Sequence, residues 1–286
     1  MGTALDSIRV FVRMYPLLVV GVALLLLVAL FGLVGSWLVD SELARPGSTP
    51  VGESPTREYI FGTDSLARDQ FAVMVHGIPQ TLRVGFMAAG IGMAVGIVFG
   101  FVGGYYGGVL DNLLKGAADI LITIPALMIL VVVAITLTGP VSVTLQALVI
   151  GSISWMWPTR TIRAQVLTMR ERAYVSVAQL SGANPFEIIF LEILPNLLPY
   201  LAASFVTVVA IALLTTIGMD ALGLGPQNQV TLGNNIYWAL FYSAPLRGLW
   251  WWWAPPIVAL GLVFLGLYMM SVGLDKIANP RLRRTG

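Results

Sequence analysis

The sequence predicts an all-α polytopic membrane protein with six transmembrane helices, and two observations lead to this fold class. Hydrophobic residues make up 57% of the 286 residues and charged residues only 10%, whereas a soluble domain carries about 25% charged residues. The chain also contains several charge-free segments of about 20 residues, the length that crosses the hydrocarbon of a bilayer. Lipid is therefore the expected solvent for most of this chain.

The composition also excludes several classes of site. The chain contains no cysteine, which excludes thiol chemistry and Cys-based zinc sites. His76 is the only histidine, so no cluster of histidines can hold a metal or relay protons. The net charge of +2 gives no reason to expect a nucleic-acid partner.

Six segments are expected to cross the membrane. Five of them carry no charge, and the third contains one acid, Asp119, near its start. The first is longer than the apolar core of a signal peptide, about 7–15 residues, so it is interpreted as a retained anchor. The six segments are residues 17–39, 84–106, 117–138, 141–157, 197–218 and 252–274.

The distribution of Lys and Arg predicts the orientation, because cytoplasmic loops are enriched in these residues. With the N-terminus in the cytoplasm, 11 of the 16 Lys and Arg lie inside and five lie outside. Both termini are therefore expected in the cytoplasm of a multi-pass protein of the cell (inner or plasma) membrane. The inner residues are Arg9, Arg13, Lys115, Arg160, Arg163, Arg170, Arg172, Lys276, Arg281, Arg283 and Arg284.

This orientation divides the chain into four parts. Residues 1–40 form a cytoplasmic stub and the first span, and residues 41–81 form an extracytoplasmic loop. Residues 82–275 form the main membrane domain, which contains a long cytoplasmic loop at 159–196, and residues 276–286 form a cytoplasmic tail. A second outer loop is expected over residues 220–249.

The cytoplasmic loop is expected to fold into two short helices joined by a sharp turn. A first helix ends at Gly182, since glycine readily adopts the left-handed conformation that closes a helix. Asn184 followed by Pro185 is typical of a new helix start, with Glu187 in its first turn. Between two spans, this arrangement predicts a rigid lever whose exposed turn can dock in a groove of another protein.

Several stretches of the chain, from about residue 60 to the end, resemble one family. Residues 174–196 are similar to the "EAA" loop of ABC importer permeases, in which Glu-Ala-Ala is followed by Gly and then by Ile-Leu-Pro. Residues 61–69 resemble the Gly-Thr-Asp-x-x-Gly-Arg-Asp signature of the dipeptide/oligopeptide permeases. Residues 103–108 with Asp111, residues 222–225 and residues 279–283 resemble an inner turn, the last outer loop and the tail of the same permeases.

The resemblance implies a type I ABC importer permease with a cytoplasmic coupling-helix loop, the family of binding-protein-dependent inner-membrane components. It implies an outer-loop structural motif of Gly62, Thr63, Asp64, Arg68 and Asp69. It also implies that the ATPase-coupling loop uses Tyr174, Ser176, Ala178, Gly182, Asn184, Pro185, Phe186 and Pro195.

The chain departs from the family pattern at three of these places. Ser176 stands where the family usually has Glu, Val177 where it has Ala, and Ala67 where it has Gly. The first departure affects one polar contact to the ATPase and leaves the helix–Gly–helix geometry unchanged.

The implied partners are a paralogous permease subunit, two ABC ATPase subunits, an extracellular solute-binding protein and the lipid bilayer. The sequence has no Gly-x-x-x-x-Gly-Lys-Ser/Thr phosphate loop, so ATP and Mg are expected on the partner subunits. We expect no catalytic residue, cofactor or metal site in this chain, which is therefore not predicted to be an enzyme.

Four polar or small-residue features have alternative interpretations. Arg68 can pair with Asp64 or Asp69, and this pairing is interpreted as ordering the outer loop in preference to contacting the substrate. An acid such as Asp119 inside a membrane is a functional candidate, but one turn from Lys115 an interfacial role is preferred. His76 is interpreted as a plain interfacial residue in preference to a pH sensor. The small-residue stripe of Gly90, Gly92, Gly96 and Gly100 is interpreted as a helix-packing surface in preference to a pore lining.

The function expected from these features is import of di- or oligopeptides, as the permease subunit of an ATP-driven importer. The alternatives are import of oligosaccharides, nickel or glutathione by a member of the same family, a self-contained secondary carrier, and a membrane scaffold that transports nothing. The sequence does not identify the residues that contact the substrate.

Overall fold

The computed structural model describes residues 9–136 and 139–278, and this part of the chain folds into helices without a β-sheet. Seven helices form the body of the molecule: α2 (Pro16–Leu38), α3 (Gln70–Tyr106), α4 (Gly108–Thr123), α5 (Ala126–Thr136), α6 (Val143–Ile153), α10 (Leu194–Ala221) and α12 (Trp250–Ala278). The predicted all-α polytopic fold is confirmed.

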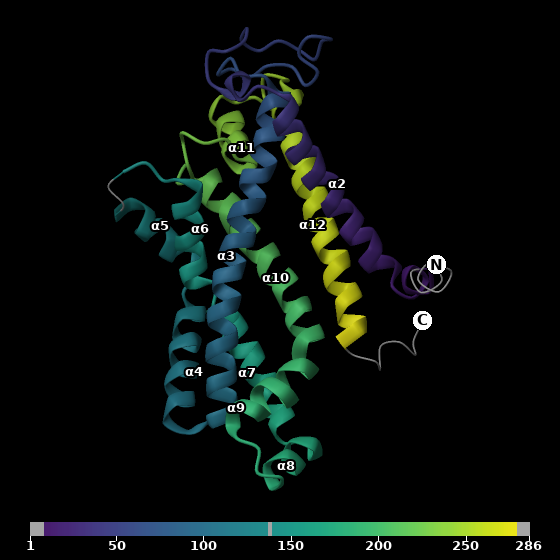
Figure 1. Ribbon diagram of the computed structural model, residues 1–286. Coiled ribbons are helices and arrows are strands. Elements are labelled where there is room, and N and C mark those ends of the chain that lie inside the picture. The colour runs from purple at the N-terminus through teal and green to yellow at the C-terminus, as the bar shows by residue number, and fades with distance from the viewer. Residues whose placement is uncertain (1–8, 137–138, 279–286) are drawn as a thin grey trace.

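Shorter elements lie at the two ends of this body (Figure 1). A 3-10 turn (Ser41–Ala44) and α11 (Leu232–Phe241) lie at one end. At the other end lie α8 (Ala173–Leu180) and α9 (Pro185–Glu187), and α9 is followed by a π-helical segment (Ile188–Ile193) that continues into α10. α7 (Met156–Arg170) leads down the body to α8.

The number of full-length spans differs from the six expected. In the described residues, four helical stretches are long and apolar enough to cross a membrane: Pro16–Leu38, Gln70–Tyr106, Pro185–Ala221 and Trp250–Ala278. A bent pair, α4 with α5, brings the number to five if it counts as one span. The expected span at 141–157 is wrong as a single helix, because α6 has 11 residues, about 16 Å at 1.5 Å per residue.

The expected span at 117–138 is also wrong as a single straight helix. α4 ends at Thr123, α5 begins at Ala126, and the two axes differ by 84°. Pro125 explains the break, because it donates no backbone hydrogen bond and disfavours helical geometry in the residue before it. Ile124 accordingly has an extended backbone (φ −87°, ψ 125°). The last two residues of the expected span, 137 and 138, lie outside the described residues.

Two expected outer loops are shorter than predicted. α3 begins at Gln70, where the Asp69 side chain accepts a hydrogen bond from the Phe71 backbone N–H, so residues 70–81 are helical and not part of the loop. The loop expected at 220–249 contains α11, whose start is capped by Thr231. A side-chain oxygen that caps the first turn satisfies backbone donors that would otherwise be unpaired.

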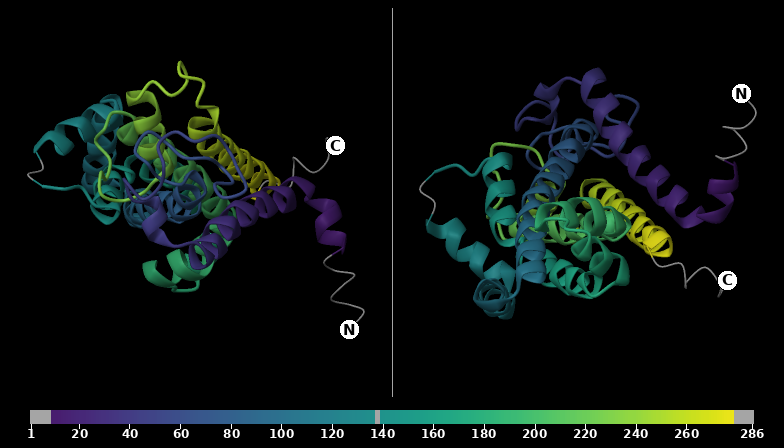
Figure 2. Two further views of the ribbon diagram at one scale, coloured as in Figure 1. Left: turned by 90° about the horizontal axis from the view of Figure 1, so that it is seen from above. Right: turned by 60° about the horizontal axis from the view of Figure 1, so that its bottom comes forward.

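α3 is the central helix of the bundle, and α6, α7 and α10 surround it (Figure 2). Three glycines of the predicted stripe permit a close approach. A Cβ atom on Gly92, Gly96 or Gly100 would lie 2.5–2.9 Å from atoms of Ser154, Pro158 or Ile162. The packing interpretation is confirmed for these three, while no described atom lies within 4 Å of the Cβ position of Gly90.

The first and last long helices also pack against each other. A Cβ on Gly21 of α2 would lie 2.6 Å from the Gly266 carbonyl oxygen of α12, and one on Gly273 would lie 2.6 Å from Leu18 Cβ. At its other end, α2 meets α3, where Gly35 leaves room for Val75. α2 thereby bridges α12 and α3.

The stripe on α3 yields a first prediction. Gly96→Ala should destabilise the protein by about 1–3 kcal/mol, because the added methyl group overlaps the Pro158 ring. Gly90→Ala is the matched control and should be neutral or slightly stabilising, since alanine favours a helix over glycine. Thermal unfolding of the two variants in detergent measures the difference. Equal midpoints would contradict the close-packing interpretation.

Candidate functional site

The loop between α7 and α10 has the predicted helix–turn–helix form. Gly182 has φ +84°, and no described atom lies within 4 Å of its Cβ position. The Asn184 side chain accepts a hydrogen bond from the Glu187 backbone N–H at 3.0 Å. The Asn184 backbone N–H donates to Glu187 Oε2 at 2.8 Å, which completes a capping box. The predicted helix end and helix start are both confirmed.

The second helix of the loop is less regular than expected. After α9, residues 188–193 form a π-helical segment, and the helix then continues through Pro195 and Pro199 into α10. Segments with π-helical geometry are uncommon and frequently occur at functional sites. The loop is therefore joined to a membrane helix without a flexible linker.

The core side of the loop is firmly anchored. Val175, Ile188 and Ile193 are almost fully buried, and the half-buried Tyr174 and Ala178 pack against the same core cluster. Tyr174 also donates a hydrogen bond to the Met169 sulfur at 3.4 Å. These contacts fix the orientation of the two short helices relative to the bundle.

The tip of the loop, residues 173–186, is largely exposed and carries no charge. Leu180 is 89% exposed and Phe186 68% exposed, and the sequence has no charged residue between Arg172 and Glu187. Ser176, Gly182, Asn184, Pro185 and Pro195 are exposed as well. The turn forms the tip of one end of the molecule (Figure 1). An exposed apolar protrusion of this kind marks a contact surface.

An ion pair ties α7 to the junction of α3 and α4. Arg163 donates hydrogen bonds from Nε to Asp111 Oδ1 and from Nη2 to Asp111 Oδ2, the second at 2.6 Å. Further along α7, Arg170 donates to the Tyr105 carbonyl at the end of α3, at 2.8 Å. α7, which leads into the loop at 171–193, is therefore linked to two neighbouring helices at the same end of the molecule.

The position of Asp119 agrees only in part with expectation. Its ion-pair partner is Arg160 of α7, 3.8 Å away, and not Lys115. Both side chains of this pair are partly exposed, Asp119 by 38% and Arg160 by 59%. Asp119 thus adds a second, weaker link between α4 and α7.

The five residues of the outer-loop motif come together at the opposite end of the molecule. Asp64 receives hydrogen bonds from Arg68 Nε at 2.7 Å and from Gln70 Nε2 at 2.8 Å. Its other oxygen accepts from the backbone N–H groups of Leu66 and Arg68. The predicted pairing of Arg68 is with Asp64, while Asp69 caps α3.

The motif extends to parts of the chain that sequence analysis left out. Asn235 of α11 accepts hydrogen bonds from Arg68 Nη2 at 3.1 Å and from Trp252 Nε1 at 3.0 Å, and donates to Gln70. Trp251 Nε1 donates to the Thr63 carbonyl at 3.0 Å, and a Cβ on Gly62 would collide with the Trp251 ring. The motif therefore connects the outer loop to α3, α11 and α12.

The Asp64–Arg68 ion pair is buried, and burial determines how much it contributes to stability. The Asp64 side chain is fully buried and that of Arg68 is 6% exposed, so the pair differs from the weak pairs of protein surfaces. Burial raises the pKa of the Asp64 carboxyl above its usual value, and the neighbouring Arg68 guanidinium offsets part of that rise.

A second buried carboxylate, Asp220 at the end of α10, was missed because it was assigned to a loop boundary. It accepts hydrogen bonds from Gln146 of α6 at 2.7 Å and from Thr231 at 2.8 Å. A Cβ on Gly225 or Gly233 would lie within 2.5 Å of its oxygens. The sequence signal for this buried site was an acid at the end of an apolar helix, followed by glycines at 223 and 225.

His76 lies in α3, two turns from its start, with Nε2 3.1 Å from the Val39 carbonyl at the end of α2.

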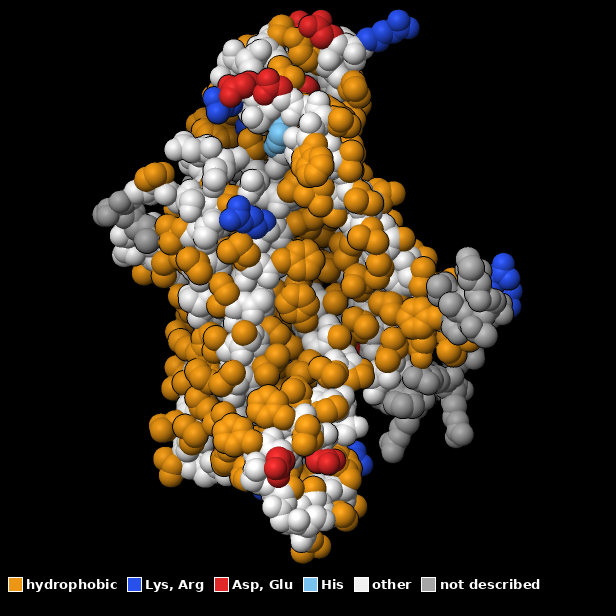
Figure 3. All heavy atoms as spheres, in the orientation of Figure 1, with side chains coloured by type: hydrophobic (Ala, Val, Ile, Leu, Met, Phe, Trp, Pro, Cys, Tyr) orange, Lys and Arg blue, Asp and Glu red, His pale blue; other side chains and the backbone are white. Residues whose placement is uncertain are grey.

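Acidic side chains on the face shown in Figure 3 gather near the two ends, and hydrophobic side chains cover most of the surface between them. This distribution matches a protein that crosses a bilayer.

Comparison with known proteins identifies the family. Residues 96–284 match the family described as binding-protein-dependent transport system inner membrane component. The chain belongs to this family.

Curated relatives cover nearly the whole chain. A putative peptide transport system permease protein of Brucella abortus is 29% identical over 93% of this chain and 88% of the relative. A probable peptide ABC transporter permease protein of Sinorhizobium fredii is 32% identical over 81% and 78%. A dipeptide transport system permease protein of Bacillus subtilis is 27% identical over 92% and 82%.

Membership in the transport-system family makes this chain a multi-pass membrane protein. Ala67, which stands where the resemblance led us to expect Gly, has a left-handed backbone (φ +59°). A non-glycine residue in this conformation costs roughly 1–2 kcal/mol.

The first prediction for the site concerns the ion pairs of α7. Arg163→Ala should destabilise the protein by on the order of 2 kcal/mol or more, because it leaves the Asp111 carboxylate, only 10% exposed, without its partner. Arg160→Ala, at the more exposed pair, is the control and should cost about 0–1 kcal/mol. Thermal unfolding in detergent compares them. A larger loss for Arg160→Ala would refute the ranking.

The second prediction concerns Ala67. Ala67→Gly should raise the free energy of unfolding by about 1 kcal/mol, because glycine adopts a positive φ without steric cost. Ala173→Gly, in the first turn of α8, is the control and should lower stability, since glycine is unfavourable in helices. Unfolding midpoints measured side by side test this. A lower midpoint for Ala67→Gly would show that the strain is absent.

Proposed function

We propose that this chain is the permease subunit of an ATP-driven importer of di- and oligopeptides. Its partners in the proposal are a paralogous permease, two ABC ATPases that bind ATP and Mg, and an extracellular solute-binding protein. The printed names of the relatives, which are peptide and dipeptide permeases, favour peptides over oligosaccharides, nickel or glutathione.

The observation that carries the proposal is the rigid coupling loop. Its tip is exposed and apolar, while its base is held by buried Val175, Ile188 and Ile193. A tip that docks on an ATPase would transmit the movement of that subunit through α7 and α10 without bending. The Arg163–Asp111 pair would carry the same movement to α4.

The proposed orientation follows from this role. The loop at 159–196, the stub before α2 and the tail at 276–286 lie in the cytoplasm, and residues 41–69 with α11 lie outside. The separation of α8 from the outer loop along the long axis of the molecule supports this assignment (Figure 1). The chain supplies no energy itself in this proposal, because the ATPase subunits hydrolyse ATP.

A charge placed at the tip tests the coupling role. Gly182→Asp should lower ATP-driven import by at least about tenfold while the chain still inserts. The tip has no charge between Arg172 and Glu187, and docking would bury the new carboxylate without a partner. Gly52→Asp is the matched control, since Gly52 also has a positive φ (+70°) and an open Cβ position but lies in the outer loop. Import and ATP hydrolysis are measured with the complete complex in liposomes.

Two results would contradict the proposal. One is wild-type import by the Gly182→Asp complex, which would remove the coupling role from the loop. The other is peptide import by the isolated subunit in liposomes, which would indicate a self-contained carrier.

A further inference from the structure

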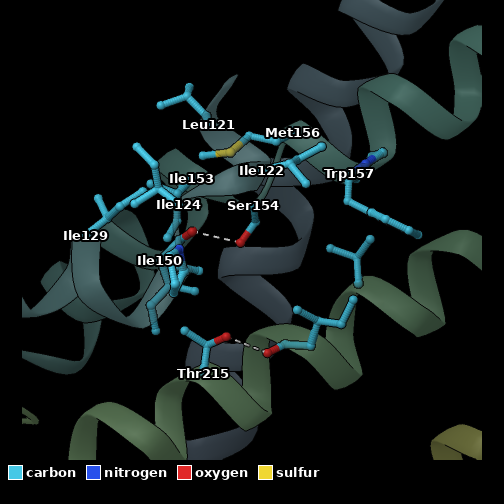
Figure 4. Close-up of a pocket in the computed structure, with 15 residues that line it drawn as sticks. Leu121, Ile122, Ile124, Ile129, Ile150, Ile153, Ser154, Met156, Trp157 and Thr215 are labelled. Carbon is cyan, nitrogen blue, oxygen red and sulfur yellow. Dashed lines mark hydrogen bonds between the residues drawn. The ribbon is translucent and has the colours of Figure 1, made fainter. Parts of the chain in front are cut away.

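Two interrupted helices meet around one hollow in the body of the protein. The first interruption is the 84° bend at Ile124 and Pro125 between α4 and α5. The second lies at Ser154 and Trp155, between α6 and α7. Residues from both interruptions line a hollow of about 260 Å³, and α10 forms its remaining wall through Val208, Ile211 and Thr215 (Figure 4).

The position of the interruptions is informative. Inside a bilayer, non-helical backbone is tolerated only where protein covers it or where it lines a cavity. The extended backbone of Ile124 lies at this hollow, whereas Ser154 and Trp155 keep nearly helical dihedral angles. The hollow therefore accounts for the break between α4 and α5. The hollow is open on one side, because Trp157 is 51% and Ile211 47% exposed.

The walls of the hollow select the chemistry of an occupant. Of the described residues that line it, none is charged, and most are Leu, Ile, Val, Met or Trp. Ser154 Oγ donates to the Ile150 carbonyl at 2.7 Å, and Thr215 Oγ1 donates to the Ile211 carbonyl at 2.8 Å (Figure 4). Both hydroxyl protons are therefore used within their own helices, and the hollow favours an uncharged, apolar group.

We propose that this hollow, here called the apolar pocket, receives an apolar side chain of a peptide during its passage. The inference rests on the proposed function, since it requires a peptide substrate. The volume is below the range of about 300–1,000 Å³ typical of sites for drug-sized ligands, so it suits one side chain and not a whole peptide. The charged ends of the peptide would contact other groups.

The test fills the pocket and compares two peptides. Complete complexes carrying Ile211→Trp are reconstituted in liposomes, and ATP-driven import of Ala-Phe-Ala and Ala-Ala-Ala is measured. The import ratio of Ala-Phe-Ala to Ala-Ala-Ala should fall roughly tenfold relative to the wild type, as expected when an apolar site loses room for its group. The same solute-binding protein serves every complex, so its own preference cancels.

The matched control lies on the same helix. Leu214 of α10 is 64% exposed and does not line the pocket, so Leu214→Trp should leave the import ratio unchanged. Ile211→Ala enlarges the pocket and should raise the import of Ala-Trp-Ala relative to Ala-Ala-Ala. This variant keeps the test decisive if Ile211→Trp fails to assemble.

The outcomes separate the pocket from the function. An unchanged ratio in Ile211→Trp, or an unchanged preference in Ile211→Ala, overturns the pocket assignment while peptide import by the wild type stands. Failure of the wild-type complex to import either peptide overturns the proposed function, and the pocket assignment with it. A changed ratio in Ile211→Trp with an unchanged ratio in Leu214→Trp supports both.

Discussion

Close contact between the backbones of α3 and α7 determines how the rest of the protein is arranged. At Gly96, Gly100 and Gly104, side chains of α7 lie where the α3 glycines carry no Cβ. Because the two helices are in contact over this length, α7 cannot tilt away from α3 without losing that packing. The Arg163–Asp111 pair and the bond from Arg170 to Tyr105 then fix the ends of α3 and α4 to the same helix. α3, α4 and α7 form one mechanical unit.

A network of buried polar groups surrounds α11 at the opposite end. Asn235 of α11 belongs to the cluster of Asp64 and Arg68, and Thr231 at its start binds Asp220. Since Asn235 accepts a hydrogen bond from Arg68 and Thr231 donates one to Asp220, moving α11 would leave buried polar groups unpaired. Hydrogen bonds between buried groups therefore stabilise the outer end, whereas apolar packing between helices stabilises the body.

The sequence predicted those features that depend on a few neighbouring residues. The turn at Gly182 and the helix start at Asn184 follow from local backbone preferences, and the Asp64–Arg68 pair follows from a spacing of four residues. The bend at Pro125 was missed because the apolar run continues on both sides of it. α11 was missed because a short amphipathic helix gives little signal among turn residues.

Contacts between distant residues could not be predicted in this way. Asp111 and Arg163 are 52 residues apart, and Arg68 and Asn235 are 167 apart, so neither pair has a local pattern. The burial of Asp220 depends on the glycines that close around it. The apolar pocket arises from three separate chain segments, and only the fold brings them together.

The contact between α2 and α12 has a consequence for biosynthesis. The small-residue face of α2 at Gly21 is covered by α12 at Gly266, which the ribosome makes more than 200 residues later. Until α12 has been inserted, the Gly21 face of α2 contacts lipid or a chaperone. Completion of the bundle is therefore a late, post-insertion event, and truncated chains would display the uncovered face to quality-control proteases.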